Sequence, residues 1–251
     1  MLYGTGTFGS GRDDSSLDRA CDGYLAQGGL SAALHSSHLS ADGAGDSDYL
    51  AACRVRNAES GPQSGSLELK LRWSTSKAPS STLTWYNEDY DGVREQAAPL
   101  GHGWSGVVRY EGGTYQVMVA LDCVNQKNKA LVAYGDLLGT SNGATLTGLG
   151  RVTTETAEKA AEKHGCQMKA GKRLTGLSTA RLGTPDTAKP LQQAQGSCVA
   201  LRRTAAQSDT PEIMEYPADP DAPQTTAIWS RRRRSPATAF TPITAPPPRT
   251  S

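Results

Sequence analysis

The sequence predicts an α+β fold: an antiparallel sheet of about five strands with two helices packed on one of its faces. The strongest observation is in residues 66–74, where every second residue is apolar and the residues between them are mostly charged. This period of two is typical of a strand that is buried on one side only. A second observation is the pair of apolar runs at residues 104–110 and 114–123, which the turn Glu111-Gly112-Gly113 joins as in a β-hairpin.

Further strands are predicted from apolar segments that are bounded by polar turns, at residues 50–57, 83–86 (a brief strand) and 130–134. The segments between them are predicted to be loops. Residues 38–47 are small and polar, and residues 87–103 are first acidic and then rich in glycine.

Two helices are predicted from their capping residues. Ser16 can cap a short helix over residues 17–25. Thr153 can cap an alanine-rich helix that runs to His164, and Gly165 follows where a C-terminal glycine is favoured.

The composition indicates a compact domain with flexible segments at both ends. The chain has 251 residues, its hydrophobic fraction is 37% and its mean hydropathy is −0.50, which is polar for a globular protein. Residues 1–14 are expected to be a flexible tether, and residues 15–169 the folded domain, with a short helical turn at 30–35. Residues 170–203 read as a linker. Residues 204–251, rich in Pro, Ala, Thr and Asp, are expected to be disordered.

Charge and hydropathy exclude some classes of protein. The net charge is +1, so no global field attracts the chain to nucleic acid or to an anionic membrane. No apolar run is long enough to span a membrane, and the first residues do not resemble a secretory signal.

The five cysteines indicate an oxidising compartment. None belongs to a Cys-x-x-Cys pair, and each lies near the end of a predicted strand or helix, at positions 21, 53, 123, 166 and 198. Such dispersed cysteines suit structural disulfides, which need an oxidising compartment. Buried free thiols in a cytosolic protein are the alternative.

Two disulfide pairings are compatible with the predicted elements. Cys21 can meet Cys53 if the first helix lies against the sheet, and Cys123 at a strand end can likewise meet Cys166 just beyond the last helix. Cys198 then has no partner, and the simplest account is that its partner belongs to a stretch that this chain lacks.

Two nucleotide-binding patterns are rejected. The sequence Gly4-x-Gly6-x-x-Gly9 matches a dinucleotide-binding fingerprint, but no strand precedes it. Residues 165–173 resemble a phosphate-binding loop with one residue too many, and Arg173 stands where a Mg²⁺-binding hydroxyl is required.

No metal, cofactor or catalytic site is predicted. Residues 88–95 hold four carboxylates that could face a hard cation, without the full ligand order of a calcium loop, and Asp42, Asp46 and Asp48 form a similar group. His35 and His38 are spaced for one helical face, with no further ligand nearby.

The nucleophile signal near His102 is also incomplete. Ser105 is followed directly by Gly106, so the Gly-x-Ser-x-Gly elbow of many hydrolases is absent.

Four consecutive arginines at residues 231–234 form a local positive charge. They could contact phosphates, anionic headgroups or a processing protease, but Trp229 and Phe240 are the only aromatic residues nearby, so nucleic-acid recognition is not supported. A solvated basic tract, or a frameshifted or truncated reading, would account for the same composition.

The order of cysteine-bearing segments resembles uncharacterised extracytoplasmic proteins of high-GC actinobacteria. The segments are Cys21-Asp22-Gly23-Tyr24-Leu25, Cys53-Arg54-Val55, residues 67–73, Leu121-Asp122-Cys123 and Lys163-His164-Gly165-Cys166. The resemblance implies a membrane anchor ahead of a cysteine-bearing α+β module, sometimes present twice, and it implies no activity. Gly196-Ser197-Cys198 and the residues after it would resemble the start of a second, truncated module.

We therefore expect a non-catalytic domain that binds or scaffolds in the cell envelope, as a membrane or secreted protein held by an upstream anchor. Its partner is unknown, and contact with a membrane is expected only through that anchor. The alternatives are a hydrolase that acts on cell-wall material and a metal or small-ligand binder, both using the acidic loop at residues 88–95.

Overall fold

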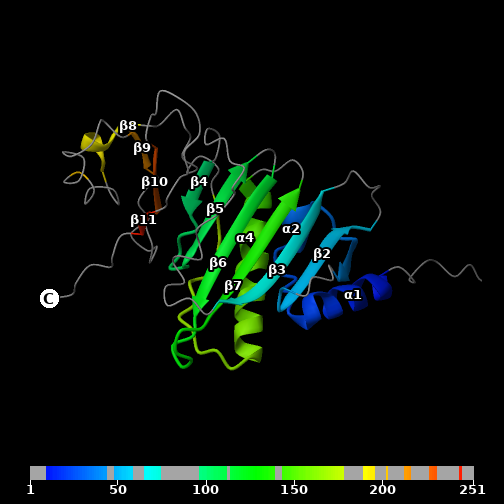
Figure 1. Ribbon diagram of the computed structural model, residues 1–251. Coiled ribbons are helices and arrows are strands. Elements are labelled where there is room, and N and C mark those ends of the chain that lie inside the picture. The colour runs from blue at the N-terminus through cyan, green and yellow to red at the C-terminus, as the bar shows by residue number, and fades with distance from the viewer. Residues whose placement is uncertain are drawn as a thin grey trace, which may run out of the picture.

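The protein is described by a computed structural model that covers residues 10–43, 48–58, 65–74, 96–111, 114–138, 143–177, 189–195, 202, 212–215, 226–230 and 243–244. Its main feature is a seven-stranded sheet in the order β1-β2-β3-β7-β6-β5-β4, in which every neighbouring pair is antiparallel (Figure 1). The strands are β1 (Leu39–Gly43), β2 (Ala51–Asn57), β3 (Ser66–Ser74), β4 (Gln96–Pro99), β5 (Gly106–Glu111), β6 (Thr114–Asp122) and β7 (Ala130–Leu138).

One face of the sheet is covered by helices. The helical elements are α1 (Ser10–Arg19), the 3₁₀ turn η1 (Ala20–Gly23), α2 (Leu30–Leu34) and α4 (Gly143–Lys163). Helix α4 lies behind the central strands in Figure 1, while α1 lies by the β1 edge of the sheet. The predicted α+β class with an antiparallel sheet is confirmed.

The sheet has two strands more than expected, and both are short edge strands. Strand β1 lies within residues 38–47 and β4 within residues 87–103, which were predicted to be loops. Neither has an alternating apolar pattern, and β4 contains Pro99, a residue that sheets tolerate at an edge. The brief strand predicted at residues 83–86 lies outside the described residues.

Both predicted helix starts were wrong. Helix α1 begins at Ser10, so Ser16 lies inside it, and the Ser16 hydroxyl accepts a hydrogen bond from the backbone of Ala41 at 3.2 Å. Helix α4 begins at Gly143, ten residues before Thr153, whose buried hydroxyl donates to the Leu149 carbonyl at 2.9 Å. Glycines and threonines in the first half of α4 obscured its start, because both are weak helix formers.

The end of α4 follows the prediction. Gly165 adopts a left-handed conformation (φ 64°), and the backbone N–H of Cys166 bonds back to the Ala161 carbonyl at 2.9 Å. This arrangement satisfies a carbonyl of the last helical turn.

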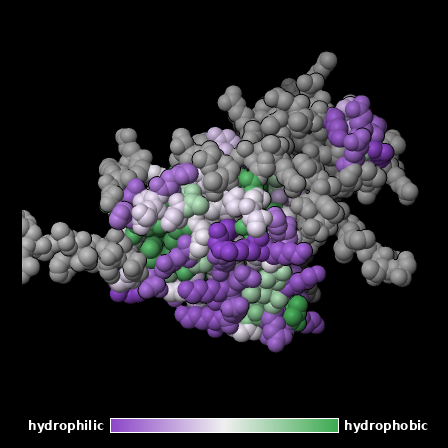
Figure 2. All heavy atoms as spheres, turned by 180° about the vertical axis from the view of Figure 1, so that it is seen from behind, coloured by the Kyte–Doolittle hydropathy of each residue, from purple (hydrophilic) through white to green (hydrophobic). Residues whose placement is uncertain are grey.

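The core lies between the helices and the sheet. Leu67, Leu69 and Leu71 of β3 are at most 1% exposed, and they belong to the same cluster as Leu146 and Leu149 of α4. From behind, the described surface over the helices is mostly hydrophilic, with small apolar areas (Figure 2).

The packed domain extends beyond residue 169, where a linker was expected to begin. Leu174 is 1% exposed and belongs to the main core cluster. The indole N–H of Trp104 donates to the Lys172 carbonyl at 2.8 Å, and the backbone N–H of Lys172 donates to the His102 carbonyl at 2.7 Å. Residues 170–177 therefore belong to the folded domain.

A second, small sheet has the order β11-β10-β9-β8. Its strands are β8 (Lys189–Pro190), β9 (Glu212–Glu215), β10 (Thr226–Ser230) and β11 (Ile243–Thr244), and a 3₁₀ turn, η4 (Leu191–Gln193), follows β8. Three of these strands fall within residues 204–251, for which the composition predicted disorder. The rest of that range lies outside the described residues.

Candidate functional site

The face of the sheet opposite the helices carries a row of polar side chains across five strands. Arg54 of β2 pairs with Glu68 of β3, Glu68 with Asp136 of β7, Asp136 with Gln116 of β6, and Gln116 with Arg109 of β5. Directly paired residues in an antiparallel sheet point to the same face. The row thus has arginines at both ends and two carboxyl groups and an amide between them.

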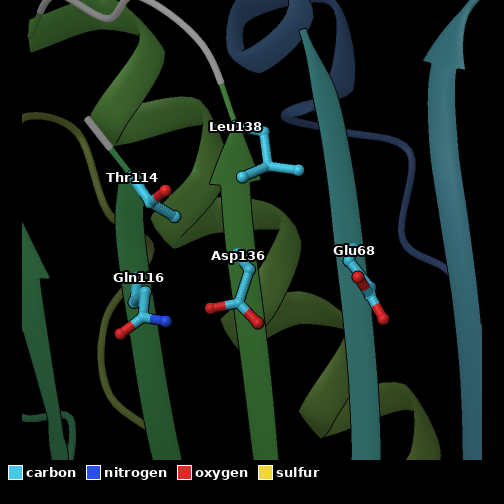
Figure 3. A pocket seen from close by; sticks show the side chains of 5 residues that line it. All are labelled: Glu68, Thr114, Gln116, Asp136 and Leu138. Carbon is cyan, nitrogen blue, oxygen red and sulfur yellow. The ribbon is translucent and has the colours of Figure 1, made fainter. Parts of the chain in front are cut away.

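The centre of this row opens into a depression of about 330 Å³, lined among the described residues by Glu68, Thr114, Gln116, Asp136 and Leu138. Figure 3 shows the Asp136 carboxyl between the Gln116 amide and the Glu68 carboxyl. Leu138, which is 47% exposed, supplies an apolar wall two residues beyond Asp136 along β7. The lining is therefore two carboxyls, one amide and one hydroxyl beside a methyl-bearing surface.

Glu68 is stabilised as an anion. Lys70 Nζ lies 3.0 Å from Glu68 Oε1, and Arg54 Nη2 lies 3.3 Å from Glu68 Oε2. Burial on its own would raise the pKa of Glu68, but the hydrogen bonds and charges of Lys70 and Arg54 together outweigh it, and the pKa lies below its ordinary value. Both carboxylate oxygens of Glu68 are therefore occupied by cations of this chain.

The pKa of Asp136 is shifted in the opposite direction, above its ordinary value. Burial raises the pKa of Asp136, and the neighbouring negative charge of Glu68 adds to this increase. The charges of Lys70 and Arg109 and a hydrogen bond from the Gln116 side chain act against it without reversing it. Two carboxyls in direct register thus differ in acidity because only one of them is fully paired with cations.

We expect that neutralising these two carboxyls at pH 7 changes the free energy of unfolding in opposite directions. Glu68→Gln should lower the free energy of unfolding by up to about 1 kcal/mol, because the bridges to Lys70 and Arg54 are lost. Asp136→Asn should raise it, because an ionised carboxyl is then no longer buried. Urea unfolding at pH 7 with both disulfides intact measures both changes.

The pH dependence of the free energy of unfolding tests these two opposite pKa shifts. The folded state depresses the pKa of Glu68, so its contribution to stability is present above the ordinary pKa of 4.5 and is lost as the pH falls through the folded value. For Asp136 the folded pKa is raised, so stability declines as the pH rises from 3.8 through the folded value. At pH 3 both variants should approach the parent. A destabilised Asp136→Asn protein at pH 7 would contradict this account.

Two disulfides join the helical layer to the sheet. Cys21 in η1 is bonded to Cys53 in β2, and Cys123 after β6 is bonded to Cys166 after α4. These are the pairs proposed from the sequence. All four cysteines are at most 5% exposed, and Cys198 lies outside the described residues.

The other candidate ligands do not come together in the described part of the chain, which holds no group of three or more His, Cys, Asp and Glu suited to a metal ion. Asp42 forms an ion pair with Arg56 on the neighbouring strand. His35 shares a hydrogen bond of 2.6 Å with the Thr145 hydroxyl, and His38 is exposed.

Several predicted features lie outside the described residues. They are Gly4, Gly6 and Gly9, Asp46, the acidic loop at residues 88–95, and the arginines at 231–234.

Sequence reasoning missed the polar row. The alternation in residues 66–74 indicated that Glu68 faces away from the core, but it could not indicate which residue lies opposite. Pairing Glu68 with Asp136 requires the register of two strands that are 68 residues apart, and no local pattern encodes it.

No protein-family model, curated protein or solved structure matches the chain. The fold and the site define its class as a disulfide-bonded α+β domain whose sheet has helices on one face, and on the other a polar row beside a small buried apolar cluster of Val107, Met118, Ala120 and Val132. Within the described residues, no helix has the length and apolar character needed to cross a membrane.

Proposed function

We propose that the chain is a non-catalytic domain that binds or scaffolds in the cell envelope, outside the cytosol, and that its polar partner contacts the depression at Glu68 and Asp136. The resemblance to actinobacterial extracytoplasmic proteins belongs to this proposal, as does a membrane anchor upstream. The two disulfides are compatible with an extracellular location, since such bonds persist in oxidising compartments.

One observation carries the assignment of the binding face: Glu68 and Asp136 are directly paired on adjacent central strands. Like charges opposite one another destabilise a sheet. Asp136, which is buried opposite the Glu68 charge, works against the fold in this way, and such residues tend to occur where function requires them. The lining offers acceptor oxygens beside an exposed leucine, which suits a partner that presents hydrogen-bond donors next to an apolar group.

The proposal predicts that the oxidised chain sediments with isolated actinobacterial cell-wall material at physiological salt. The double variant Glu68→Gln/Asp136→Asn should lose about tenfold in affinity, as expected when two acceptor groups in one site are altered. The matched control is Glu158→Gln/Glu162→Gln on α4, which removes the same charge from the helix side. Equal retention of both double variants, with both disulfides formed, would rule out this face.

A hydrolase that acts on wall material is a second candidate, favoured by one observation. The environments of Glu68 and Asp136 shift their pKa values in opposite directions, which a nucleophile and a general acid require. Binding is favoured over catalysis because both oxygens of Glu68 already contact cations. Release of reducing sugar from the same wall material by the parent, and not by Asp136→Asn, would favour the hydrolase.

A further inference from the structure

The turn that carries Cys21 has an unusual backbone. Cys21 (φ 50°, ψ 43°), Asp22 (φ 55°, ψ 34°) and Gly23 (φ 77°) are three consecutive residues in the left-handed region. Glycine adopts this conformation without a steric penalty and Asp tolerates it better than most residues, whereas a cysteine there costs enough to change an equilibrium constant by about tenfold. The penalty falls directly on a disulfide-bonded cysteine and on the residue after it.

The second disulfide avoids this cost. Its left-handed residue is Gly165, one position before Cys166, and neither Cys123 nor Cys166 is among the residues with a positive φ. A Cβ built on Gly165 would meet no atom within 4 Å. The two disulfides therefore differ in the backbone strain that their formation maintains.

Contacts with α4 hold the strained turn in place. Lys163 Nζ donates to the Asp22 carbonyl at 3.3 Å, and the Tyr24 hydroxyl lies 2.8 Å from His164 Nε2. The Lys163 contact is exposed, where a single hydrogen bond contributes little, whereas Tyr24 is 5% exposed and packs in the main core cluster with Leu17 and Ala20. The Cys21–Cys53 bond adds a covalent tie between η1 and strand β2 to this packing.

We infer that Cys21–Cys53 is a redox latch: a dithiol reductant opens it before Cys123–Cys166, and its opening releases residues 10–24 from the sheet. In the reaction one thiolate of the dithiol attacks a cysteine sulfur and breaks the S–S bond, forming a mixed disulfide. The second thiol of the reductant then displaces the remaining cysteine. Cys21 and Cys53 gain two electrons and two protons, and the reductant becomes a cyclic disulfide.

The sulfurs of the latch are shielded, so the test is made at equilibrium. Cys21 is 2% exposed and Cys53 is 0% exposed, and attack on either sulfur requires local opening. The full chain, in a Cys198→Ser background that removes a competing thiol, is equilibrated with mixtures of reduced and oxidised dithiothreitol. Free thiols are then trapped with a maleimide and located by peptide mass spectrometry.

We expect Cys21 and Cys53 to be alkylated at about a tenfold lower ratio of reduced to oxidised reagent than Cys123 and Cys166. Simultaneous opening, or earlier opening of the second pair, would overturn the inference.

Two substitutions, one that introduces a glycine and one that removes a glycine, test whether backbone strain sets the order in which the disulfides are reduced. Asp22→Gly removes one strained side chain while it keeps the carbonyl that Lys163 contacts, so Cys21–Cys53 should become harder to reduce. Gly165→Ala introduces the same strain beside Cys166, so the second pair should become easier to reduce. An unchanged gap between the two pairs in both variants would show that backbone strain does not set their order.

Release of the segment is tested separately, at the ratio where only the first pair is open. Trypsin should then cleave after Arg19 in α1 and leave Lys159 in α4 as protected as in the oxidised protein. Continued protection of Arg19 would show that the disulfide opens without releasing anything, and the latch would be rejected.

Discussion

Replacing Gly148 with alanine should lower the free energy of unfolding by about 3 kcal/mol, the upper end of the usual cost of overpacking. A Cβ at this position would lie 2.6 Å from the backbone nitrogen of Ala33 and 2.7 Å from the carbonyl oxygen of Gly29. Both are backbone atoms of the α2 region, so no side-chain rotation can relieve the overlap. Helix α2 would have to move away from α4. Urea unfolding of the oxidised protein measures the change.

Gly150 provides a control in the same helix. An alanine Cβ there would meet the methyl ends of Leu177 at 2.7 Å and Leu174 at 2.9 Å, which are side-chain atoms that can turn away. Both substitutions gain the same helix propensity, about 1 kcal/mol. Gly150→Ala should therefore change stability by about 1 kcal/mol or less. Equal destabilisation by the two alanines would mean that contact between α2 and α4 does not require glycine.

This close packing explains why the start of α4 could not be predicted from the sequence. The first half of the helix holds Gly148 and Gly150, and its threonines bond within the domain: Thr145 to His35 and Thr153 to the Leu149 carbonyl. The Thr153 bond lies within the helix, but Thr145 and Gly148 disfavour a helix locally and contact residues that are distant in the sequence, His35 and Ala33. Tertiary packing thus overrides propensity in this segment.

The centre of the sheet was predictable because its pattern is local. Strand β3 alternates along its length, since one face packs in the core with α4 and the other is half-buried and carries charged side chains. The edge strands β1 and β4 carry no such pattern. Their formation depends on hydrogen bonds to β2 and β5, which the sequence does not display. The candidate site shares this difficulty, because it depends on the register between Glu68 and Asp136.

Removing the second disulfide should have an effect as large as the Gly148 substitution. The variant Cys123→Ala/Cys166→Ala should lose about 4 kcal/mol, because the bond closes a loop with a sequence separation of 43 and so restricts the unfolded chain. Replacing both cysteines leaves no new thiol. The measurement is urea unfolding without reductant.

The first disulfide should contribute less than its loop length implies, and this difference separates strain from chain entropy. Its separation of 32 would give nearly the same entropic stabilisation, but left-handed Cys21 and Asp22 offset part of it. Cys21→Ala/Cys53→Ala should therefore cost about 2 kcal/mol. Equal losses in the two double variants would remove the case for strain at η1.

The two losses together, about 6 kcal/mol, are comparable to the whole stability of many domains. A chain with this dependence needs a compartment in which its sulfur bridges persist, so full reduction should unfold the sheet as followed by circular dichroism.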